Sequence, residues 1–99
     1  MRQEFPEKII LAGNICTQEG VKMLNELNID IIKAGIGGGS ACTTRIQTGI
    51  GMPQLSCIME CIEECYKYNN YLQVHKSFIL SDGGITCPGD VAKSFWCRL

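Results

Sequence analysis

Three short apolar runs, each followed by a turn-forming segment, constrain the fold of this chain more than any other feature. The runs are Ile9–Gly13, Ile31–Ala34 and Phe78–Leu80. Two segments with apolar residues at helical spacing, Gln18–Leu27 and Gln54–Tyr68, lie between them. Strands that alternate with helices typically form a parallel sheet with right-handed crossovers. We therefore predict an α/β chain of about three consecutive βα units with parallel strands.

Capping and breaking residues predict where the helices begin and end. Thr17 is a suitable N-cap for the first helix, and Asn69-Asn70 is expected to end the second. Pro88 suits the first turn of a short last helix that continues over Gly89–Phe95. The apolar stripes of the first two helices would contain Val21, Leu24 and Leu27, and Leu55, Ile58, Met59, Ile62 and Cys65.

The segments that follow the three predicted strands are expected to lie close together. Asn14–Thr17 should turn the chain after the first strand, Gly35–Arg45 should form a loop after the second, and Asp82-Gly83-Gly84 should end the third. The carboxyl ends of parallel strands meet at one edge of the sheet, and ligands of such sheets bind beyond that edge. The sequence therefore predicts a ligand site made from these three segments.

The loop Gly35–Arg45, with the sequence GIGGGSACTTR, carries the residues best suited to catalysis. Glycine is unfavourable inside helices and strands, but it lets a backbone approach a ligand closely. Cys42 follows the glycines, and a thiolate held near backbone N–H groups is a nucleophile. A flexible surface loop and a buried structural cysteine are the alternatives that the residues alone leave open. Because hydroxyl residues and Arg45 surround the thiol, we predict that this loop is the active site.

Three further cysteines, Cys57, Cys61 and Cys65, repeat every fourth residue on one face of the second predicted helix. Three thiols could bind zinc or an iron–sulfur cluster, but the spacing lacks a C-x-x-C pair and no fourth ligand is obvious. The thiols are in phase with Ile58, so core packing is the better interpretation. His75 is the one histidine of the chain, and we expect it in a solvated loop.

Length and composition exclude several classes of protein. The 99 residues form one domain at most, and the formal net charge of -1 gives no indication of a nucleic acid or an anionic membrane as partner. There is no apolar run of about 18 residues to span a membrane, and the first residues lack the apolar segment of a signal peptide. Seven cysteines, an odd number, favour reduced thiols and a cytoplasmic location over a disulfide framework.

The predicted sheet is too large for the chain to cover. Three parallel strands leave two unpaired edges, and continuous apolar runs need cover on both faces. A chain of 99 residues with three predicted helices is too small to supply that cover. We therefore expect the chain to be a piece of a larger barrel or sheet.

The segments around the predicted strand ends resemble the IMP dehydrogenase and GMP reductase superfamily. The resemblance is carried by AGN at 12–14, IIKAGIGGGSACTTRIQTGIGMPQLS at 31–56 and SDGGITCPGDVAKSF at 81–95. Both enzymes share the loop pattern GxGxGSxCTTR followed by TGxGxPQ, whereas CPGDVAK, together with the QTG before PQLS, is similar to GMP reductases in particular. The resemblance implies a TIM (β/α)8 barrel. This chain would supply the fifth, sixth and seventh strands as a single partial domain over 1–99, truncated at both ends.

Three departures from the family pattern accompany this resemblance. Gly38 stands where the family commonly has proline, and Tyr66–Lys76 is several residues longer than the usual connection. After Phe95 the family continues into an eighth strand, whereas this sequence ends at Leu99. The ending resembles that of a truncated product.

The resemblance implies that Cys42 is the nucleophile. Its thiolate would displace ammonia from C2 of GMP, and NADPH would reduce the resulting covalent thioimidate to IMP. Thr44 would carry protons to and from the leaving group, tuned by a glutamate that lies beyond this sequence. The remaining implied contacts are Gly37, Gly39, Cys42 and Arg45 for a potassium ion, Ser40, Asp82, Gly83 and Gly84 for the nucleotide, and Ile36 and Gly37 for the nicotinamide cofactor.

Two alternatives to a GMP reductase segment remain. The first is a segment of IMP dehydrogenase, which uses water instead of ammonia at the same cysteine and takes NAD. The second is a non-catalytic fragment, because catalysis needs the assembled site and the glutamate partner of Thr44 is absent from the sequence. This chain alone is therefore expected to be inactive. The full-length family typically forms homotetramers.

Overall fold

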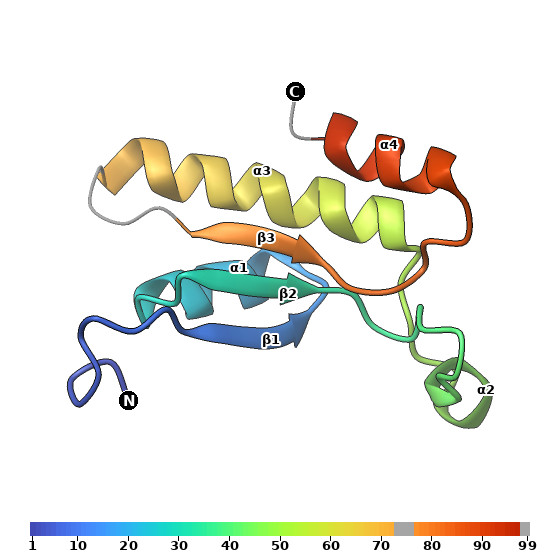
Figure 1. Ribbon diagram of the computed structural model, residues 1–99, viewed down its shortest axis with the longest axis horizontal. Helices are drawn as coiled ribbons and strands as arrows, with labels where there is room; N and C mark the ends of the chain where they lie inside the picture. Colours follow the sequence, from blue (N-terminus) through green and yellow to red (C-terminus); the bar gives the residue numbers. More distant parts are fainter. Residues whose placement is uncertain (73–76, 98–99) are drawn as a thin grey trace.

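A single parallel sheet organises the computed structural model, which describes residues 1–72 and 77–97. Its strands are β1 (Leu11–Ile15), β2 (Ile31–Ala34) and β3 (Phe78–Ser81), in the spatial order β1-β2-β3. Both neighbouring pairs are parallel, so all three strands run in the same direction and their carboxyl ends meet at one edge (Figure 1). The predicted α/β chain with three parallel strands is confirmed.

Four helices connect and follow the strands: α1 (Gln18–Glu26), α2 (Thr44–Thr48), α3 (Gln54–Leu72) and α4 (Pro88–Trp96). Thr17 caps α1 as predicted, because its Oγ1 accepts a hydrogen bond of 3.3 Å from the Gly20 amide. Pro88 occupies the first turn of α4, also as predicted. None of the helices in the described ranges is both long and apolar enough to span a membrane.

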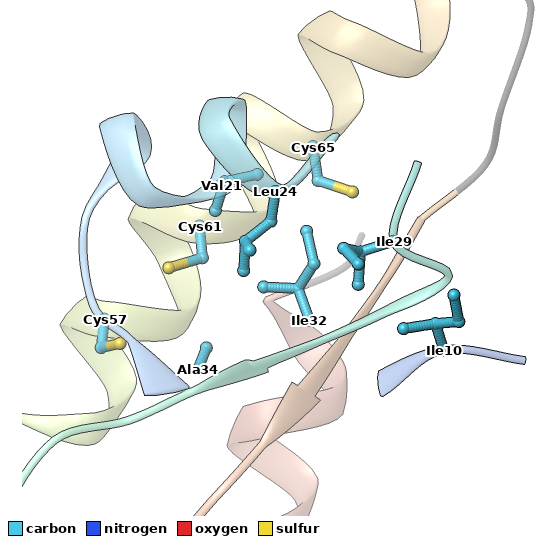
Figure 2. Close-up of a cluster of buried hydrophobic side chains, with 9 residues drawn as sticks. All are labelled: Ile10, Val21, Leu24, Ile29, Ile32, Ala34, Cys57, Cys61 and Cys65. Carbon is cyan, nitrogen blue, oxygen red and sulfur yellow. The ribbon is translucent and has the colours of Figure 1, made fainter. Parts of the chain in front are cut away.

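The hydrophobic core lies between the sheet and the two helices α1 and α3. Figure 2 shows side chains of α1 and α3 directed toward those of β2. Ile32 and Ala34 of β2 are fully buried, as are Val21 of α1 and Cys61 of α3. The core cluster comprises Ile10, Val21, Leu24, Ile29, Ile32, Ala34, Cys57, Cys61 and Cys65.

The opposite face of the sheet is open to solvent. The register places Leu11, Ile31 and Phe78 side by side across the three strands. Leu11 is 47% exposed and Phe78 is 54% exposed, and Leu80 further along β3 is 43% exposed. The expectation that Ile9–Gly13 and Phe78–Leu80 form buried strands is therefore wrong on this face of the sheet. The open face agrees with the expectation that the chain cannot cover its own sheet.

Several predicted boundaries and burial assignments are wrong. Strand β1 begins two residues later than expected and includes Asn14 and Ile15, because Ile15 still pairs with Ala34. The predicted break at Asn69-Asn70 is absent, since α3 continues to Leu72; the low helix propensity of Asn is only a weak preference.

The loop after β2 ends at Thr43, because Thr44–Thr48 is helical. Three residues of the predicted apolar stripes are substantially exposed: Leu27, Leu55 and Met59.

Candidate active site

The carboxyl ends of the three strands are joined by one polar side chain. Asn14, at the end of β1, donates through Nδ2 to the Gly35 carbonyl, at 2.9 Å, and to Oδ2 of Asp82, at 2.7 Å. Gly35 directly follows β2 and Asp82 directly follows β3. The predicted convergence of the three strand ends is therefore confirmed.

Asp82 receives a second partner that sequence reasoning missed. The Nζ atom of Lys33 lies 3.0 Å from Oδ2 of Asp82. The hydrogen bond from Asn14 and then that from Lys33 hold the pKa of the Asp82 carboxyl below its usual value. Both contacts fall on Oδ2, and within the described residues Oδ1 has no recorded partner. The only sequence signal for Lys33 was one charge inside an apolar strand, IIKA.

Two loops at this edge contact each other directly. We call residues Gly35–Thr43 the cysteine loop and residues Asp82–Gly84 the aspartate loop. The Gly84 amide donates to the Gly38 carbonyl at 2.8 Å, so the two loops share a backbone hydrogen bond. This contact places the loop that carries Cys42 against the loop that carries Asp82, and Ser40 is exposed on the cysteine loop, two residues before Cys42.

Cys42 and Thr44 form a hydrogen-bonded pair. The Sγ atom of Cys42 lies 3.2 Å from Oγ1 of Thr44. The Thr44 side chain, followed by the Thr44 backbone amide, lowers the pKa of the Cys42 thiol, and the positive charge of Arg45 acts in the same direction. A lowered pKa increases the fraction of reactive thiolate near neutral pH. The thiol is only partly buried, so it is open to a reagent or a substrate.

Arg45 holds the cysteine loop to the segment before α3. Its Nη2 donates to the Met52 carbonyl at 2.5 Å and to the Ile36 carbonyl at 3.4 Å. The Met52 amide in turn donates to the Ile36 carbonyl at 3.3 Å. A guanidinium group has no acceptor atom, so the Arg45 side chain orders the loop rather than binding a cation.

Gln54 is a second residue of this edge that sequence reasoning did not assign to the site. Its Nε2 donates to the Ala34 carbonyl at 2.9 Å and to Oγ of Ser81 at 3.0 Å. Ala34 ends β2 and Ser81 ends β3. The signal for it was its place in the motif GIGMPQ, where the sequence alone gave it no role.

The groups of the cysteine loop that could coordinate a cation are mainly backbone carbonyl oxygens. Gly39 and Cys42 are linked by a backbone hydrogen bond of 3.0 Å, in which the Gly39 carbonyl accepts. A carbonyl oxygen has a second lone pair, so this bond leaves Gly39 able to coordinate a cation. Within 1–72 and 77–97, no cluster of His, Cys, Asp and Glu is suited to a transition metal. The carbonyl oxygens of the loop thus suit a hard cation better than they suit zinc.

The three cysteines of α3 do not belong to the site. Cys57 and Cys61 are completely buried and Cys65 is 6% exposed, and all three pack in the core (Figure 2). Burial is the largest cause that raises the pKa of the Cys61 thiol, which keeps it protonated and unreactive. The core-packing interpretation is confirmed. His75 lies outside the described residues.

Comparison with known proteins points to one enzyme family. Residues 1–97 match the family model described as IMP dehydrogenase / GMP reductase domain. The chain is 52% identical over 95 residues to GMP reductase of Phytophthora infestans and 50% identical over 95 residues to GMP reductase 1 of Homo sapiens. These alignments cover 96% of this chain but 24% and 26% of the two relatives. The chain thus spans about a quarter of the length of the curated relatives that it matches.

A solved structure agrees with this assignment. A GMP reductase from Trypanosoma brucei superposes on the chain with a TM-score of 0.79 and 31% sequence identity. The superposition covers 90% of this chain and 19% of the larger one. The three-stranded fold therefore corresponds to a fragment of that enzyme.

Proposed function

Because this chain belongs to the IMP dehydrogenase / GMP reductase family, we propose that it is the segment of a GMP reductase that carries the catalytic cysteine. The observation that carries the proposal is the Cys42–Thr44 pair, at the end of a loop that is hydrogen-bonded to the aspartate loop. A thiol with a lowered pKa at the carboxyl edge of a parallel sheet suits covalent chemistry on a bound ligand. In the corresponding larger protein, the sheet would be part of a TIM barrel.

The proposed reaction begins when the Cys42 thiolate adds to C2 of GMP. The C2–N bond breaks, ammonia leaves with a proton, and a thioimidate joins Sγ to C2. Bound NADPH would provide the hydride that C2 needs, and the Cys42 thiolate would then leave C2 as the C–S bond breaks, releasing IMP. The Thr44 hydroxyl lies 3.2 Å from Sγ, so it is placed to donate to the thiolate and to pass a proton to the leaving amine.

The nucleotide would be held mainly by the aspartate loop. Oδ2 of Asp82 is fixed by Asn14 and Lys33, so Oδ1 is available to accept from the ribose hydroxyls. Gly83 and Gly84 would let the backbone approach the nucleotide, and Ser40 is exposed on the facing loop. Because these groups lie on two loops that contact each other, they support a nucleotide that binds to both loops.

The two cofactors would use the cysteine loop. Potassium would be coordinated by the carbonyl oxygens of Gly37, Gly39 and Cys42, with Arg45 holding the loop in place. Ile36, which is partly buried at the start of the loop, and Gly37 would contact the nicotinamide. A cytoplasmic location and a homotetramer of the full-length enzyme complete the proposal.

We expect the 99-residue chain by itself not to turn over GMP. Within the described residues, Oγ1 of Thr44 has the Cys42 thiol as its one hydrogen-bond partner, and a threonine needs an acidic neighbour to act as a base. The sheet face opposite the helices is also open to solvent. These observations favour a non-catalytic fragment over a complete enzyme, while an IMP dehydrogenase segment is the alternative within the family.

The proposal is tested by the intact mass of the chain after incubation with 6-chloropurine ribonucleotide, an electrophilic analogue of the substrate. One covalent adduct is expected, which GMP suppresses and Cys42→Ala removes. Cys87→Ala is the matched control, because Cys87 is an exposed cysteine outside the site, and it should keep the adduct. No adduct on a Cys42 thiol that iodoacetamide still alkylates would contradict the proposal that Cys42 and the aspartate loop form a nucleotide site in this chain.

A further inference from the structure

The Gln54 side chain lies between the ends of two neighbouring strands. Its Nε2 donates to the Ala34 carbonyl, at 2.9 Å, and to Oγ of Ser81, at 3.0 Å. The Ala34 carbonyl also accepts from the Asp82 amide at 2.9 Å. Because a carbonyl oxygen only accepts, the amide nitrogen of Gln54 must face Ala34. One side chain thus contacts the residue before the cysteine loop and the residue before the aspartate loop.

Each loop also packs against Gln54 at a glycine: Gly35 in the cysteine loop and Gly84 in the aspartate loop. A Cβ atom on Gly35 would lie 2.3 Å from the Asp82 carbonyl oxygen and 2.6 Å from Oε1 of Gln54, and one on Gly84 would lie 2.7 Å from the Gln54 Cβ. Gly84 in addition has a φ of 70°, a conformation that other residues rarely adopt. The two backbones therefore approach the glutamine more closely than any larger residue would allow.

Packing by itself does not explain a glutamine at this position. The Oε1 atom is buried and has no hydrogen-bond partner in the described part of the chain. Burying an amide oxygen without a partner is unfavourable, and a methionine of similar shape would avoid that penalty. The benefit of glutamine must come from the two hydrogen bonds of its amide nitrogen.

We propose that Gln54 is a positioning residue that fixes the distance between the cysteine loop and the aspartate loop, and hence between Cys42 and the nucleotide. The loops meet at Gly84, which packs against Gln54 and whose amide donates to the Gly38 carbonyl. The part of this inference that concerns the nucleotide rests on the proposed function; the part that concerns the two loops does not.

The test compares amide hydrogen exchange of the full chain with that of Gln54→Met, measured by NMR. The Gly84 and Asp82 amides report on the loop contact and the end of β3. The Phe78 and Asp30 amides, bonded to Asp30 and Ile10 carbonyls, report on the opposite edge of the sheet. We expect about tenfold faster exchange at Gly84 and Asp82 when the bonds of Gln54 are lost, with the far edge unchanged.

Two further variants separate positioning from general stability. Gln47→Met is the matched control, since Gln47 is exposed on α2, and it should leave all four amides unchanged. Ser81→Ala removes one of the two acceptors, so it should accelerate the same two amides less strongly and add nothing to Gln54→Met. If Gln54→Met accelerates exchange equally at all four amides, or not at all at Gly84 and Asp82, the proposal is overturned. It is also overturned if the Gly84 and Asp82 amides of the wild-type chain show no protection from exchange.

The link to the nucleotide has its own readout. In Gln54→Met, the rate of adduct formation with 6-chloropurine ribonucleotide should fall about tenfold, while alkylation of Cys42 by iodoacetamide stays within about twofold. Equal effects on both reagents would overturn positioning toward the nucleotide. If the wild-type chain forms no adduct but shows the expected exchange pattern, the proposed function fails and the coupling of the two loops by Gln54 stands.

Discussion

The reactivity of Cys42 depends on its immediate neighbour Thr44. The Thr44 hydroxyl is the largest cause of the lowered pKa of the Cys42 thiol, so Thr44→Val should raise that pKa toward the ordinary value. At neutral pH the thiolate fraction, and with it the rate of alkylation by iodoacetamide, should fall by a factor of about two to ten, the effect of one hydrogen bond. The measurement is the rate of Cys42 alkylation as a function of pH, followed on the Cys42 peptide by mass spectrometry.

Thr43→Val provides the control for this prediction. Thr43 is the adjacent residue and its side chain caps no helical amide, so its replacement should leave the pH profile of Cys42 unchanged. The midpoint of the profile should move to higher pH in Thr44→Val alone. An unchanged midpoint in Thr44→Val would show that the hydroxyl does not stabilise the thiolate.

Helix α3 places its cysteines on the face that packs against the sheet. Cys57 and Cys61 are fully buried, whereas Cys87, which precedes α4, is exposed. Burial raises the pKa of the Cys57 and Cys61 thiols and also blocks reagents. In the folded chain, we therefore expect iodoacetamide at pH 8 to label Cys42 and Cys87 at least about tenfold faster than the two thiols of α3.

The same labelling in strong denaturant controls for intrinsic differences between the peptides. All these cysteines should then react at similar rates, because burial and the contact with Thr44 are lost together. Rapid labelling of Cys57 and Cys61 in the folded chain would mean that α3 opens from the sheet on the time scale of the reaction.

The asymmetry of the sheet determines which apolar residues stabilise the fold. Ile32 faces α1 and α3 and is fully buried, whereas Leu80 faces the open side and is 43% exposed. Ile32→Ala should lower the free energy of unfolding by about 2–5 kcal/mol, and Leu80→Ala should lower it by about 1 kcal/mol or less. Urea denaturation followed by circular dichroism measures both values. Equal losses at the two positions would show that the open face is covered in solution, for example by self-association.

Much of the local structure follows from the sequence. The apolar runs predicted the three strands, and β2 was predicted to the residue. Thr17 and Pro88 began their helices as their chemistry requires, and the motif around Cys42 gave the family. These features are local: they depend on propensities, caps and residue types within a few positions.

The tertiary structure alone decided which side chains complete the site. Lys33 stands out locally only as one charge in an apolar strand, and Gln54 only by its place in the motif GIGMPQ. Their roles depend on the register between β2 and β3 and on where α3 begins relative to the sheet. The exposure of Leu11, Phe78 and Leu80 could likewise not be predicted, because the apolar strands that contain them have the composition of buried strands. A sequence pattern states that a residue favours burial or can donate a hydrogen bond. Only the packing of segments that are distant in sequence determines whether a neighbouring group covers that residue or accepts its hydrogen bond.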